Sequence, residues 1–265
     1  RKRGQNYFSA RKRCFSRQLV QKIVLTPFSI RYFASFALNW MYSITDSYTP
    51  SDPWRAAGTT SHELYVTWAK PTADPLYHTL VHLGTTNADG KDGTVEAPVL
   101  ADIWSEFTDL DVRRRDGELM VYYGPTIDPL TVLPHELTTA GLLEHKAGRC
   151  QAWAYLFHDV LRAQGMASGE TRAIIPKPLA GHTTVGFDLL ASLIGQGNTN
   201  PPDQFQNHMV VWLNGTIYDP SYGKPHAGLA AWEDASLLKT VYKRLSDDTI
   251  IYVWNTPAEE TQWAQ

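Results

Sequence analysis

The stretch Gly148-Arg149-Cys150-Gln151-Ala152-Trp153-Ala154-Tyr155-Leu156-Phe157 decides the fold of this chain. Its apolar side chains, continued past its end, recur every three or four residues, which is the spacing of a helix with one buried face. These positions are Trp153, Leu156, Phe157, Val160 and Leu161. Gly165 follows at the place where a glycine commonly ends a helix. The pattern predicts a helix that begins at Cys150, directly after the Gly148-x-Cys150 turn.

The position of Cys150 has a chemical consequence. The first turn of a helix carries unpaired backbone N–H groups and the positive end of the helix dipole, and both stabilise a thiolate. The thiolate is the form of cysteine that acts as a nucleophile. A second interpretation is that Cys150 is a small buried hydrophobe, which is the usual role of a lone cysteine in a helix. A base held near the thiol would favour the first interpretation.

Residues 205–213 supply a candidate base on a predicted strand. Alternation puts Phe205, Met209, Val211 and Leu213 on one face and Gln206, His208, Val210 and Trp212 on the other. Asn214-Gly215 is a strong signal for a two-residue hairpin turn, with residues 216–219 returning as the partner strand. Leu213 then opposes Thr216, so Asp219 faces Val210. His208 and Asp219 become diagonal neighbours on one face of the sheet.

An imidazole held by a carboxylate is the orienting half of a nucleophile–base–orienter triad. The alternative is a surface His–Asp pair on an exposed sheet face. Val210 and Trp212 share the face of His208 and indicate that this face is covered, which favours the catalytic interpretation.

Taken together, these residues resemble the transglutaminase-like superfamily, which has a papain-like Cys-His-Asp core. The resemblance rests on Gly148-x-Cys150 at a helix start, His208 on a strand and Asp219-Pro220 on the next, and it covers about residues 97–223. It implies Cys150 as nucleophile, His208 as general base and acid, and Asp219 as orienter. Two positions depart from the family pattern. Val210 stands where many relatives have an aromatic residue, and Gln151 where animal transglutaminases have tryptophan.

The resemblance implies thiol-dependent acyl transfer or hydrolysis at peptide or carboxamide bonds, through a thioester, by a transglutaminase-like protease, deamidase or transglutaminase. An arylamine N-acetyltransferase-like enzyme and a non-catalytic binding module on the same fold are the alternatives. His182 competes with His208 for the role of base. The backbone N–H of Cys150 would be one oxyanion donor. The second donor stays open among Trp104, Tyr123 and Gln151.

Composition indicates a soluble globular protein, with 43% hydrophobic and 19% charged residues among 265. The two cysteines, Cys14 and Cys150, exclude a disulfide framework and a cysteine-rich zinc site, and residues 87–93 do not fit the EF-hand pattern. We therefore predict no metal and no cofactor. The sequence has no run of eighteen apolar residues, so no transmembrane helix is predicted. A reactive thiol is compatible with a reducing compartment and slightly favours the cytoplasm.

The sequence suggests a basic N-terminal arm (1–18), a β-rich region (19–95) and a transglutaminase-like catalytic domain of α/β (α+β) class (96–265). In that domain the Cys150 helix is expected to pack on an antiparallel sheet. Residues 1–17 hold seven basic side chains and no acidic one. The arm is either a solvated tail or a segment that binds nucleic acid, an acidic partner or an anionic membrane surface. A protein or peptide substrate is expected, and nucleic acid is the least expected of these partners.

Further elements are predicted from shorter patterns. In the β-rich region, strands are expected at residues 21–25, 35–42, 63–68 and 77–83. Further along, a helix is expected over 98–108, and Asp116-Gly117 predicts a hairpin between 111–115 and 118–123. A short helix over 140–145 and a strand over 171–175 flank the Cys150 helix. A final amphipathic helix with Leu229, Trp232, Leu237, Leu238 and Val241 is followed by a strand over 250–254.

Overall fold

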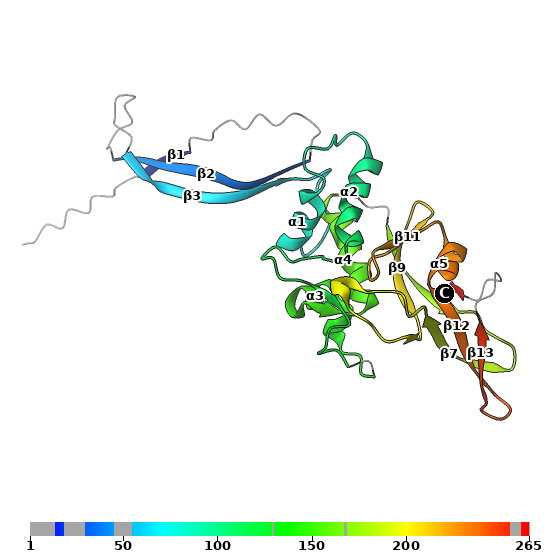
Figure 1. Ribbon diagram of the computed structural model, residues 1–265. Coiled ribbons are helices and arrows are strands. Elements are labelled where there is room, and N and C mark those ends of the chain that lie inside the picture. The colour runs from blue at the N-terminus through cyan, green and yellow to red at the C-terminus, as the bar shows by residue number, and fades with distance from the viewer. Residues whose placement is uncertain are drawn as a thin grey trace, which may run out of the picture. The chain divides into compact units, whose positions relative to one another are not determined.

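The computed structural model describes residues 14–18, 30–44, 55–128, 130–166, 169–254 and 261–264 (Figure 1). The chain divides into two units. The first combines Arg1–Pro27 with Tyr32–Leu64, and the second combines Phe28–Arg31 with Tyr65–Gln265. Among the described residues, no helix has both the length and the apolar character needed to cross a membrane.

Nearly all of a three-stranded sheet, in the order β1-β2-β3, belongs to the first unit. Its strands are β1 (Cys14–Gln18), β2 (Arg31–Ile44) and β3 (Arg55–Val66), and β1 runs antiparallel to β2 with Cys14 opposite Ile44. The last five residues of the predicted arm, 14–18, therefore belong to a strand. Residues 1–13 of the arm and the predicted strand at 21–25 lie outside the described residues.

Four helices come first in the second unit, and α4 is the one that the others contact. They are α1 (His78–Thr86), α2 (Glu96–Thr108), α3 (Thr139–His145) and α4 (Cys150–Ala163). The helices α1 and α3 pack on α4, and strand β9 (His208–Leu213) packs on it as well. The helix predicted from the opening stretch thus begins at Cys150, as expected, and buries Trp153, Leu156, Phe157, Val160 and Leu161.

Two antiparallel sheets follow the helices. The first has the order β11-β10-β9-β6-β14, with β6 (Glu170–Pro176), β10 (Thr216–Asp219), β11 (Lys224–His226) and β14 (Thr261–Trp263). The second has the order β13-β12-β7-β8, with β7 (His182–Leu189), β8 (Gln204–Phe205), β12 (Leu237–Arg244) and β13 (Ile250–Trp254). Helix α5 (Leu229–Ser236) lies between β11 and β12 in the chain. The described part of the chain is therefore mixed α and β with antiparallel main sheets, in agreement with the predicted class.

Short elements complete the unit. Strands β4 (Val121–Tyr122) and β5 (Ala147–Gly148) form a parallel pair, and the 3-10 helices η1 (Pro134–Leu137) and η2 (Gln196–Asn198) lie in connections. The predicted hairpin around Asp116-Gly117 is present as an antiparallel bridge between Arg113 and Leu119.

An aromatic cluster joins α2, α4 and β10 in the core. The ring centroid of Trp104 lies 4.9 Å from that of Phe157 and 4.8 Å from that of Tyr218, both in edge-to-face arrangements. Phe107 stacks on Trp104 at 5.7 Å. Phe107 and Phe157 are fully buried, and burial of such a side chain contributes about 1.5–3 kcal/mol to folding, so this cluster helps to hold α4 against the sheet.

Two predicted elements are wrong in type. The pattern at residues 77–83 predicts a strand, but α1 begins at His78, and Leu80 and Leu83 are buried three residues apart on one helical face. The final helix is predicted to reach Val241, but α5 ends at Ser236 and Leu237 starts strand β12. Short apolar runs fit either period, so packing against α4 and β7 decided these two cases.

The stretch 205–213 is predicted to be one strand and forms two. Phe205 ends β8 in the four-stranded sheet, whereas His208 begins β9 in the five-stranded sheet. The chain therefore passes from one sheet to the other within three residues, directly before His208. Gln206 and Asn207, which make this crossing, are both exposed.

Candidate active site

The hairpin that carries His208 and Asp219 has the predicted register. Asn214 and Gly215 have φ values of 50° and 84°, as a type I′ turn requires, and Thr216 pairs with Leu213. As a result, His208 Nε2 lies 2.8 Å from Asp219 Oδ2. Both side chains are almost completely buried, at 0% and 1% exposed. The structure therefore brings together the two residues that the hairpin register predicted.

Two other groups hold Asp219 in place. The backbone N–H of Ser221 donates to Oδ1 at 3.2 Å, and Trp232 Nε1 donates to Oδ2 at 3.3 Å. The ring of Trp232 also stacks on that of His208, with centroids 5.8 Å apart and planes 21° apart. Sequence reasoning assigned Trp232 only to the apolar face of a helix. Its contact with the pair depends on how α5 packs, for which no local pattern gives a signal.

Cys150 is the first residue of α4, and Gly148 just before it packs closely against α3 and α4. A Cβ atom on Gly148 would be 3.0 Å from Ala152 Cβ and 3.2 Å from a methyl group of Leu142, so a side chain there would press on α3 and α4. The neighbouring strand pair is held by a hydrogen bond from the Tyr123 N–H to the Gly148 carbonyl, 3.2 Å long. This packing places the start of α4, with its outward-facing N–H groups, at a defined position.

His208 also interacts with Cys150, and the pKa of His208 reflects this. Burial alone lowers the pKa of a histidine, but the charge and hydrogen bond of Asp219, together with Cys150, raise the pKa of His208 from 6.5 to about 10. Within the part of the chain that the structure describes, buried His208 Nδ1 has no hydrogen-bond partner. With Nε2 bound to Asp219, Nδ1 is the nitrogen left to exchange a proton with the thiol.

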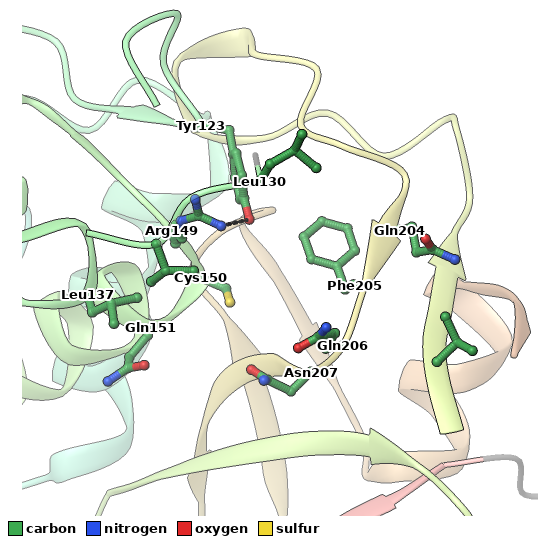
Figure 2. A pocket seen from close by; sticks show the side chains of 12 residues that line it. Tyr123, Leu130, Leu137, Arg149, Cys150, Gln151, Gln204, Phe205, Gln206 and Asn207 are labelled. Carbon is green, nitrogen blue, oxygen red and sulfur yellow. Dashed lines mark hydrogen bonds between the residues drawn. The ribbon is translucent and has the colours of Figure 1, made fainter. Parts of the chain in front are cut away.

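A cavity of about 540 Å³ opens beside Cys150, which is within the usual range for small-ligand sites. Figure 2 shows the sulfur pointing into it, with Leu137 and Gln151 on one side and Phe205 and Gln206 on the other. The lining mixes apolar, amide and charged groups: Tyr123, Leu130, Val132, Leu137, Arg149, Cys150, Gln151, Val185, Gln204, Phe205, Gln206 and Asn207.

Arg149 shapes one wall of this cavity. Its buried guanidinium donates from Nε to Glu136 Oε2 at 2.9 Å and from Nη1 to the Tyr123 hydroxyl at 3.1 Å. Nη2 donates to the backbone carbonyls of Asp128 and Thr131. The side chain therefore ties several segments that precede the helix to the start of α4. Sequence reasoning did not identify this role, because the partners lie 13 to 26 residues away from Arg149.

Tyr123 is held in a rare backbone conformation at the cavity. Its φ is 50°, in the left-handed region that bulky residues seldom adopt, and such outliers cluster at functional sites. Burial and the neighbouring Cys150 raise its pKa, so the phenol keeps its proton. Its oxygen accepts the Arg149 hydrogen bond, which leaves its own O–H available as a donor.

The other residues considered from the sequence are placed differently. Gln151 lines the cavity with Tyr123, whereas Trp104 belongs to the aromatic core. His182 begins β7, its Nδ1 lies 2.8 Å from the Ala180 carbonyl oxygen, and it does not line the cavity. Of the three candidates for a second oxyanion donor, Tyr123 and Gln151 are therefore beside the thiol.

The raised pKa of His208 predicts how stability depends on pH. The folded protein keeps this proton up to about pH 10, whereas an ordinary histidine loses it near 6.5. The stabilisation is therefore complete below about pH 6.5 and falls progressively as the pH rises towards 10. We expect the His208 ring signals in NMR to titrate near pH 10 in the wild-type chain and closer to 6.5 in Asp219→Asn. A wild-type His208 that titrates near 6.5 would contradict a charged pair.

Comparison with known proteins adds no assignment: no protein-family model, curated protein or solved structure matches the chain. Across the residues that are described, no three side chains from His, Cys, Asp and Glu are grouped so that they could hold a metal ion.

Proposed function

We propose that the protein is a thiol-dependent enzyme that hydrolyses peptide or carboxamide bonds or transfers their acyl groups, with a transglutaminase-like core. One observation carries this proposal: Cys150, at a helix start and lining a cavity, interacts with a buried histidine whose pKa is raised to about 10 and which is held by Asp219. A histidine that keeps its proton beside a thiol favours the thiolate–imidazolium pair on which cysteine nucleophiles depend.

The reaction would begin when the Cys150 sulfur attacks the carbonyl carbon of the substrate. The C–S bond forms, the carbonyl oxygen becomes an oxyanion, and His208 Nδ1–H protonates the nitrogen that leaves as ammonia or an amine. The C–N bond breaks and a thioester remains on Cys150. Water or an amine then attacks the thioester, His208 accepts its proton, and the thiolate is released.

Two donors are available for the oxyanion. The Cys150 backbone N–H lies at the start of α4 and has no carbonyl partner within the helix. The Tyr123 hydroxyl lines the same cavity, and its hydrogen bond from Arg149 makes it a stronger donor. Preorganised donors of this kind are commonly the largest electrostatic contribution to acyl transfer.

The lining of the cavity supports an amide substrate. Gln204, Gln206 and Asn207 all line the cavity, and a carboxamide both donates to and accepts from a peptide group. Val132, Leu130 and Leu137 supply an apolar wall that can hold the rest of an acyl side chain.

Mass spectrometry of a peptide mixture incubated with the protein tests the proposal. Cleaved peptides would identify a protease, a one-dalton increase a deamidase, and a mass adduct in the presence of a primary amine a transglutaminase. We expect one of these changes with the wild-type chain and none with Cys150→Ala. Unchanged peptides in both reactions would contradict the enzyme and favour a binding module on the same fold.

A further inference from the structure

A second cavity, of about 340 Å³, lies beside the thiol cavity and has no role in the proposed mechanism. The two cavities share Tyr123 as a lining residue. Two segments of the chain also pass from one cavity to the other. Residues within 123–127 and 200–203 line the second cavity, whereas residues within 130–137 and 204–207 line the thiol cavity. The walls are therefore continuous in the chain, and one extended ligand can occupy both cavities.

The lining of the second cavity suits the side chain of lysine or arginine. Most of it is apolar, and the apolar residues include Pro125, Ile127, Pro201 and Pro202. Asp203 is the one charged residue among those that line it, and it is exposed. No donor or cation in the described part of the chain pairs with the Asp203 carboxylate. Lysine and arginine have a long apolar stem and a cationic end, so the stem can pack on the prolines while the cation meets this carboxylate.

The thiol cavity offers no comparable partner for a cation. Arg149 is the one residue with a permanent charge among those that line it, and its guanidinium is paired with Glu136 at 2.9 Å. A charged side chain that leaves water without gaining a partner is costly. We therefore expect the residue that reacts with Cys150 to be uncharged, and a basic residue to lie further along the same peptide.

The backbone of β8 favours an extended peptide as the occupant. This strand is the last in its sheet, and among the described strands it pairs with β7. The Leu189 N–H donates to the Asp203 carbonyl at 2.9 Å. The alternation of an antiparallel pair then turns the N–H and C=O of Gln204 away from β7. Gln204 is exposed and lines the thiol cavity, so an extended peptide along this wall has main-chain partners there.

We propose that the second cavity is a substrate subsite that binds a lysine or arginine side chain of an extended peptide, with Asp203 as the residue that recognises the cation. The identity of this peptide as a substrate rests on the proposed function. Asp203 precedes the residues 204–207 that line the thiol cavity. An extended peptide advances by about the same 3.3 Å per residue as a strand, so the basic residue should lie about two to four residues from the one that reacts.

Affinity selection with the Cys150→Ala chain tests the subsite without turnover. Random-sequence synthetic peptides are passed over the immobilised chain, and the retained peptides are sequenced by mass spectrometry. We expect enrichment of lysine and arginine, its loss in the additional variant Asp203→Asn, and enrichment of acidic residues in Asp203→Lys. For one selected peptide, Asp203→Asn should weaken binding by about two- to fivefold, as expected for a partly exposed ion pair. High salt should reduce this difference.

Asp234→Asn is the matched control, because it removes the same charge from an exposed aspartate on α5 that lines neither cavity. It should retain the same peptides, and so should Asp203→Glu, which keeps the charge. The subsite is overturned if no peptide is retained, if the retained peptides show no excess of lysine or arginine, or if Asp203→Asn and Asp234→Asn bind equally well.

Turnover by the wild-type chain separates this proposal from the proposed function. If peptides are modified without a preference for a basic residue near the reacting one, the subsite is wrong and the enzyme stands. If basic peptides are retained through Asp203 but never modified, the enzyme is wrong and the cavity is a binding site for basic peptides.

Discussion

Replacing Cys150 by alanine is expected to remove turnover almost completely, by a factor on the order of 10⁵–10⁶, as loss of the nucleophile does in a triad enzyme. The reason is that no other described thiol lines the cavity, so no thioester can form. The same placement predicts selective chemistry in the wild-type chain. Iodoacetamide at about pH 6 should label Cys150 faster than Cys14, because the thiolate is the reacting form.

Cys14→Ala is the control for both measurements, since Cys14 belongs to β1 in the other unit. This variant should retain turnover, and peptide mapping should still find the label on Cys150. Equal labelling of the two cysteines, or turnover that survives in Cys150→Ala, would refute the assignment of the nucleophile.

Asp219→Asn is expected to lower turnover by about 10²–10³ while the fold is kept. The comparable change in a serine-protease triad costs about 10⁴. A thiolate–imidazolium pair depends less on its third member, so the loss should be smaller. In the structure, Asp219 Oδ2 accepts from both His208 and Trp232. If the substituted amide kept its oxygen towards the Ser221 N–H, its NH₂ group would face those two donors.

The pH profile and a second variant show whether Asp219 acts through its charge on His208 or only through packing. Asp219→Asn should shift the pH dependence of turnover, because the pKa of His208 falls when the carboxylate is lost. Trp232→Phe keeps the stacked ring but removes the N–H donor to Asp219, so we expect only a small loss of turnover and little shift of the pH profile. A loss in Trp232→Phe equal to that in Asp219→Asn would mean that packing, rather than the carboxylate charge, is what matters.

Part of this site could be read from the sequence because it depends on neighbouring residues. Asn214-Gly215 specifies a two-residue turn, and such a turn determines which residues oppose each other across the strands. His208 and Asp219 are only eleven residues apart, so the turn is enough to bring them to 2.8 Å. The start of α4 at Cys150 was equally local, because a glycine, a helical apolar period and a closing glycine all lie within one short segment.

The remaining features depend on packing between segments that are distant in the chain. A short apolar run fits a helix or a strand equally well. Residues 77–83 therefore became helical, and residues 237–241 became a strand, because of how they pack against α4 and β7. The crossing from β8 to β9 before His208 could not be predicted either, because an alternating pattern does not indicate which sheet a strand joins.

The sequence by itself determined the start of the Cys150 helix and the register that pairs His208 with Asp219, because both follow from backbone geometry over a few residues. Only the tertiary structure decided that the helix start meets this hairpin, that Trp232 covers the pair, and that Arg149 connects Glu136 and Tyr123 beside the thiol. These contacts join helices and strands through their buried faces. A sequence pattern predicts which face of an element is buried, but not which other element packs against it.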